Sequence, residues 1–212
     1  MQLRKLQPGD FAANLALAEL YFNSGRPVDA IPLIEASIKT DPKRSASYLL
    51  LADALGEAGR NQEMITPLEA CLELTPDEFA AHANLAFAYY TAGRSDEAIF
   101  QAQWCLARSP NFNKVRLILA HAQRDKGEHA ASLATVVRAE PENLDTILLQ
   151  ADLVFFGGDG RDVFDRLVPF YEKHRDSRKL ISHLMRAAVA KGDREQAKHW
   201  QKILSDLIPE KE

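Results

Sequence analysis

The sequence predicts an all-α solenoid built from repeated pairs of antiparallel helices. Three markers recur along the chain at a single step of 34 residues. They are a proline (residues 8, 42, 76 and 110), the dipeptide Leu-Ala (beginning at 17, 51, 85 and 119) and the dipeptide Gly-Arg (beginning at 25, 59 and 93). Because independent markers share one period, the chain consists of a repeated unit that must stack on its neighbours to bury its apolar surface.

The segment 79–110 shows the unit most clearly, with one helical pattern on each side of Gly93. Its apolar residues recur at i, i+3, i+4 and i+7, which is the spacing of an amphipathic helix and not of a strand. They are Leu85, Ala86 and Tyr89 in the first helix, and Ala98, Ile99, Ala102, Cys105 and Leu106 in the second. Gly93 can adopt the left-handed conformation that ends the first helix, and Pro110 stops the second.

These residues resemble the tetratricopeptide repeat, a helical hairpin of 34 residues. Leu85 and Ala86 stand at its Leu-Gly places, Tyr89 at its Tyr place, Ala98 at its first Ala place and Pro110 at its closing Pro. The tryptophan of the family pattern is replaced in each of the first three units. The resemblance implies a right-handed α-solenoid that binds other proteins.

The repeat divides the chain into a short leading segment and six units. Residues 1–10 are expected to be the tail of a preceding helix, and residues 11–212 an array with units at 11–44, 45–78, 79–112, 113–143, 144–177 and 178–211. The fourth unit is three residues short, because Pro141 follows Pro110 by 31 residues. The fifth has no closing proline and contains Gly157-Gly158-Asp159-Gly160, which is expected to be a turn.

Charge and hydropathy narrow the classes of partner. The net charge is −4, and residues 1–106 carry 8 Lys and Arg against 14 Asp and Glu, which argues against nucleic acid as the partner. No apolar run is long enough for membrane insertion. The first six residues are too few and too polar for a signal peptide, so a cytoplasmic location is expected, or a periplasmic one if a signal has been removed.

The sequence shows no pattern typical of a catalytic, cofactor or metal site, and we expect none. His-Glu-x-x-His, Cys-x2-Cys and the phosphate-binding Gly-x4-Gly-Lys-Ser/Thr are all absent, and the six histidines lack metal-ligand spacing. Cys71 and Cys105 hold equivalent places in adjacent units. Equivalent helices pack about 8–10 Å apart, which is too far for a disulfide, so both are expected to be buried thiols.

The resemblance implies that the first helices of the units line a concave groove where a protein or peptide binds. The residues predicted to face it are Glu19, Phe22, Leu49, Asp53, Asn84, Phe87, Tyr90, Lys114, His121, Arg124, Asp152, Phe155, Phe156, His183 and Arg186. Such an apolar and aromatic groove suits an amphipathic helix or an extended segment. Alternatively, several of the Leu and Phe side chains pack between adjacent helices.

The groove predicts a protein-interaction scaffold, part of a larger protein or assembly. Family members that hold the acidic tails of heat-shock chaperones use a clamp of Lys, Asn and Arg, and a carboxylate (Glu19 or Asp53) stands here where an amide belongs. A chaperone-tail adaptor is therefore not expected. One alternative is a regulatory or substrate-presenting arm of an enzyme, such as a glycosyltransferase, whose catalytic domain lies outside this chain.

A second alternative is a module that assembles with itself through its terminal helices. The last predicted helix, 194–208, carries Trp200 and several Leu and Ile residues, and no polar capping helix follows it. Its apolar face is expected to be exposed for a partner subunit unless Trp200 packs inside its own repeat.

Overall fold

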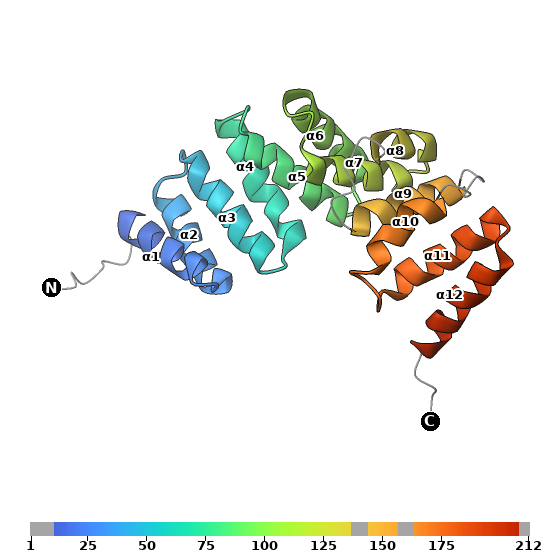
Figure 1. Cartoon of the computed structure of the whole chain (residues 1–212). Coiled ribbons are helices and arrows are strands. Elements are labelled where there is room, and N and C mark those ends of the chain that lie inside the picture. The colour runs from blue at the N-terminus through green and yellow to red at the C-terminus, as the bar shows by residue number, and fades with distance from the viewer. Residues whose placement is uncertain (1–10, 137–143, 157–162, 208–212) are drawn as a thin grey trace. The chain divides into compact units, whose positions relative to one another are not determined.

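The structure is a computed structural model that describes residues 11–136, 144–156 and 163–207. Within these ranges every regular element is helical (Figure 1). Pro8, Pro141, the cluster Gly157-Gly158-Asp159-Gly160 and Pro209 lie outside the described residues. The chain divides into two compact units, Met1–Ala122 and Gln123–Glu212, and the boundary falls within a helix.

Unit 1 contains consecutive helical hairpins. Their elements are α1 (Phe11–Asn23), α2 (Pro27–Thr40), α3 (Ser45–Glu57), the 3-10 turn η1 (Asn61–Met64), α4 (Ile65–Leu74), α5 (Phe79–Thr91), α6 (Ser95–Arg108) and the first part of α7 (Asn113–Asp125). The helices α1, α3, α5 and α7 begin at residues 11, 45, 79 and 113, so helix starts follow the 34-residue step.

Small side chains allow the helices of unit 1 to approach closely. Ala18, Ala52 and Ala86 are fully buried, as the repeat pattern requires. Cys71 and Cys105 are buried free thiols, which confirms the prediction for both. Burial raises the pKa of the Cys71 thiol, and it raises the pKa of the Cys105 thiol to about 11.

The turn at Gly93 shows why the Gly-Arg dipeptide recurs. Gly93 has φ 74°, and the backbone N–H of Arg94 donates to the Tyr89 carbonyl at 2.9 Å, which closes the end of α5. The Arg94 side chain pairs with Glu97 at 2.8 Å and lies 4.4 Å from the centre of the Tyr89 ring. The arginine therefore joins the end of the first helix to the start of the second.

Unit 2 contains the end of α7 together with α8 (His129–Val136), α9 (Leu144–Phe156), α10 (Val163–Tyr171), α11 (Arg178–Lys191) and α12 (Arg194–Asp206). Its core includes residues of α9 to α12. Trp200 of α12 is only 6% exposed and meets the Tyr171 ring edge-on at 4.7 Å. Of the two alternatives that the sequence left open for Trp200, the structure shows the second: the side chain packs within its own unit.

Among the described helices, none is both long enough and apolar enough to cross a bilayer.

Candidate functional site: a pocket in unit 1

A pocket of about 400 Å³ opens on unit 1 between residues of α1, α3, α5 and α7. Its lining brings together five of the residues predicted to face the groove, Phe22, Asp53, Asn84, Phe87 and Lys114. The lining is completed by residues that were not predicted to face the groove, namely Gly56, Glu57, Gly59, Asn61 and Met64. Side chains from four successive first helices therefore converge on one hollow.

Gly56 lines this pocket without a side chain. It lies 34 residues after Phe22 and 34 before Tyr90, so it holds the place that a large ring fills in the units on either side. A Cβ at Gly56 would lie 3.2 Å from the Met64 sulfur, so even one added carbon would press on the lining. The sequence pattern that marks this site is a glycine at a repeat position where the units on either side carry an aromatic residue.

Asp53 supplies a carboxylate inside the pocket. The Asn84 side-chain amide donates to its Oδ1 at 2.9 Å. Burial is the main cause that raises the pKa of Asp53; the Asn84 hydrogen bond opposes it, Glu57 raises the pKa further and Lys114 lowers it. Among the described residues, neither Asp53 nor Glu57 forms an ion pair, and Lys114 acts on Asp53 without a direct contact.

Two phenylalanines form apolar walls. Phe22 is half-buried against the core residues of the first two hairpins, and Phe87 is half-buried against those of the third. Beyond Phe87, the rings of Tyr90 and His121 lie 5.8 Å apart in a tilted arrangement. The surface thus carries exposed ring area beside two carboxylates.

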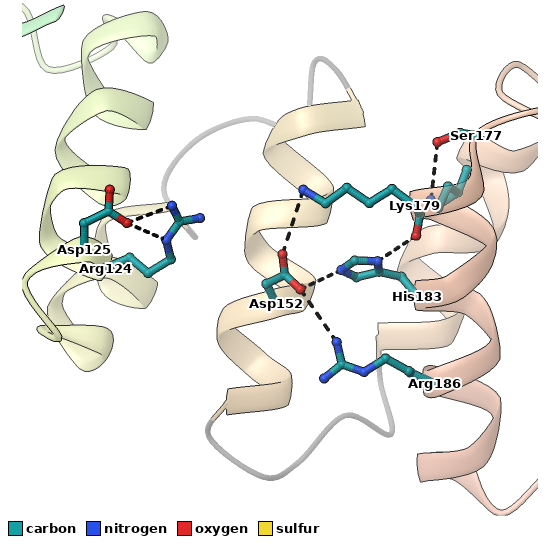
Figure 2. A network of polar contacts seen from close by, with 8 residues as sticks. Arg124, Asp125, Asp152, Ser177, Lys179, His183 and Arg186 are labelled. Atoms are coloured by element: carbon teal, nitrogen blue, oxygen red, sulfur yellow. Dashed lines mark hydrogen bonds and ion pairs between the residues drawn. The ribbon is translucent and has the colours of Figure 1, made fainter. Parts of the chain in front are cut away.

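In unit 2, a second set of predicted residues forms a polar cluster between α9 and α11. Figure 2 shows the Asp152 carboxylate facing Lys179, His183 and Arg186. His183 Nε2 lies 2.7 Å from Asp152 Oδ1, while Arg186 and Lys179 are more distant, at 3.8 and 4.0 Å. The Arg186 guanidinium also lies 4.3 Å from the centre of the Phe155 ring.

His183 is a structural part of this cluster. It is 5% exposed, and its Nδ1 donates to the Lys179 carbonyl oxygen at 2.7 Å, because a carbonyl oxygen can only accept. Its other nitrogen contacts Asp152. Since the His183 nitrogens use their hydrogen-bonding capacity inside the unit, the cluster holds α9 against α11 and leaves Lys179, Arg186 and part of Asp152 exposed to solvent.

The other predicted residues are dispersed. Glu19 is exposed on α1, whereas Leu49 is half-buried against the core and thus packs between helices. Arg124 forms an ion pair with its neighbour Asp125 at 2.8 Å. Phe156 is 66% exposed, with its ring centre 3.7 Å from that of His129.

A ring stack between α5 and α6 was also missed by the sequence analysis. The His82 ring stacks on Trp104 at 3.5 Å, and the Arg108 guanidinium lies 3.5 Å from the centre of the same indole ring. His82 additionally contacts Gln101 and the Pro76 carbonyl, so its role is to fix the hairpin.

Comparison with known proteins gives a consistent fold. The family model described as tetratricopeptide repeat matches residues 2–45 and 49–103. The crystal structure of PilW, a type IV pilus biogenesis factor, is 19% identical with a TM-score of 0.73 and 95% coverage of each chain. PilF from Pseudomonas aeruginosa is 16% identical with a TM-score of 0.75, covering 95% of this chain and 93% of its own.

A third solved structure is that of YrrB, described as a tetratricopeptide repeat protein with an unusual peptide-binding site. It is 13% identical with a TM-score of 0.70, covering 84% of this chain and 93% of its own. The comparison with curated proteins gives no match. At these identities the solved structures show the fold alone, and they confirm the predicted all-α solenoid.

Proposed function

We propose that this chain, of which residues 2–45 and 49–103 match the tetratricopeptide repeat model, is a protein-interaction scaffold that holds a peptide or helical segment of another protein against the first helices of unit 1. It acts by binding and not by catalysis. The observation that carries this proposal is the pocket at Gly56, where Phe22, Asp53, Asn84, Phe87 and Lys114 converge.

The chemistry of the pocket supports a peptide ligand. Half-buried rings offer apolar contact area, and the polar side chains between them can fix the orientation of a bound segment. The volume of about 400 Å³ suits one anchoring side chain of a longer segment. The peptide-binding site described for YrrB, a protein of the same fold, is consistent with this role.

The test is a selection of random peptides displayed on phage against the immobilised full chain, followed by affinity measurements by fluorescence anisotropy. Phe87→Arg places a charge in the wall of the pocket and should weaken the binding of selected peptides at least tenfold. Phe100→Arg is the matched control, because Phe100 is 63% exposed on α6 and does not line the pocket.

Circular dichroism must first show that both variants are folded. Equal binding by Phe87→Arg and wild type would place the binding surface elsewhere. Failure to select any peptide that depends on Phe87 would contradict the proposal as a whole.

A further inference from the structure

The unit 1 pocket has a charge pattern that the proposed function does not use. Its lining contains two carboxylates, Asp53 and Glu57, and one cation, Lys114. We propose that the pocket holds a lysine or arginine side chain of the bound segment, whose aliphatic stem contacts Phe22, Met64 and Phe87 and whose charged head lies against Asp53 and Glu57. This inference rests on the proposed function and names the anchor that the site selects.

The two carboxylates lie on the same face of one helix. Asp53 and Glu57 are four residues apart on α3, so their side chains are neighbours on the helix surface. Asp53 Oδ1 accepts from Asn84, which orients the carboxylate and leaves Oδ2 without a partner among the described residues. An ammonium or guanidinium group has several N–H donors and can bind both carboxylates at once.

The end of α3 adds to the negative field. The pocket is lined by Gly56, Glu57 and Gly59, which lie at or just beyond the C-terminus of this helix. The C-terminal end of a helix carries a partial negative charge that favours a nearby cation. The backbone at the end of α3 and the two carboxylates therefore both favour a positively charged ligand.

The walls suit the remainder of a lysine or arginine side chain. Long basic side chains lay their methylene groups on apolar surface and keep the charge at the polar end. A cation within about 6 Å of a ring face is also attracted to that face. Phe22 and Phe87 provide rings, and the flexible Met64 side chain adapts to the stem.

Burial disfavours the charged form of Asp53. Burial is the main cause that raises the pKa of this carboxyl group, so its charged form lacks full compensation within the chain. A partner cation supplies that compensation on binding. Lys114 is exposed on α7 and lowers the pKa of Asp53 through its charge, but it forms no ion pair among the described residues, so it compensates the carboxylate only in part.

The experiment uses the peptides selected in the test above. The selected sequences should share a lysine or arginine next to apolar residues, and replacing this residue by norleucine should weaken binding about tenfold or more, as for the loss of a hydrogen bond to a charged group. Asp53→Asn should weaken the parent peptide similarly. The asparagine oxygen still accepts from Asn84, so the variant removes the charge and keeps the internal bond.

A double-mutant cycle separates this contact from a general charge effect. For the norleucine peptide, Asp53→Asn should cause little further loss, because the two changes remove one shared interaction. Glu73→Gln is the matched control: it changes the net charge equally from an exposed position on α4 that does not line the pocket. Gly56→Leu, whose side chain would displace Met64 in the pocket lining, should weaken binding of the same peptides.

The outcomes distinguish the two proposals. Peptides that depend on Phe87 but lack a basic anchor, or that bind Asp53→Asn as tightly as wild type, would overturn this inference and leave the scaffold function standing. Absence of any peptide dependent on Phe87 would overturn both.

Discussion

Tyr89 offers the sharpest test of how unit 1 is held together. Its side chain is 5% exposed, its hydroxyl donates to Glu69 Oε1 at 2.6 Å, and the Arg94 guanidinium lies over its ring. Truncating a large buried aromatic side chain to alanine costs about 3–5 kcal/mol, because apolar contact is lost and a cavity remains. Tyr89→Ala should therefore lower the free energy of unfolding of unit 1 by that amount.

A second substitution divides this cost between the ring and the hydroxyl group. Tyr89→Phe keeps the ring and removes only the bond to Glu69. Because Glu69 is exposed and can turn to water, the expected loss is about 1 kcal/mol. The ring then accounts for most of the cost of the alanine variant.

The assay is urea unfolding followed by tryptophan fluorescence. The chain has two tryptophans, Trp104 in unit 1 and Trp200 in unit 2, so a Trp200→Phe background reports on unit 1 alone. Phe100→Ala, at an exposed position of α6, should change stability by no more than about 0.5 kcal/mol. A loss below about 1 kcal/mol for Tyr89→Ala would refute the assignment of this ring to the core.

Two further predictions concern titration and the polar cluster. Burial raises the pKa of Cys105 from 9.0 to about 11, so the unfolded thiol loses its proton before the folded one as pH rises between these values. The free energy of unfolding should therefore fall above pH 9.0 by an amount on the order of 2 kcal/mol, and Cys105→Ala should remove this decrease from urea-unfolding measurements. Equal slopes of unfolding free energy against pH for the two proteins would contradict the prediction. Asp152→Ala should destabilise unit 2 by about 1–3 kcal/mol, because buried His183 loses a hydrogen-bond partner. Trp200 fluorescence during unfolding measures this loss, and unchanged stability would show that the cluster does not hold α9 to α11.

The repeat signal was sufficient to predict the fold because it reflects local and nearest-neighbour requirements. Gly93 marks a left-handed turn, and Ala86 marks a close helix contact; the structure confirms both. Each depends on residues within one hairpin or its neighbour, so the sequence step carries the information. The two buried cysteines followed from the same reasoning.

The site was harder to predict because it depends on which side chains are missing or turned inward. The position of Gly56 in the repeat was visible, but the hollow arises only when neighbouring rings and Met64 surround it. Likewise, His183 was predicted to face an open groove, and its contact with Asp152 on the preceding first helix leaves it buried. Trp200 could have packed inward or outward on sequence grounds, and the shape of the core around Tyr171 decides between them.

Two adjacent positions of the repeat differ in how strongly helix packing constrains them. Residues 18, 52, 86 and 120 are all alanine and all fully buried, since any larger side chain would separate the packed helices. The next residue in each helix is glutamate, aspartate, phenylalanine and histidine at 19, 53, 87 and 121, and none of these is fully buried. Packing thus requires alanine at one position of each of the four helices, whereas the next position can vary in charge and size. The order of acidic and then aromatic side chains along this second series matches the proposed ligand, a basic anchor followed by apolar residues.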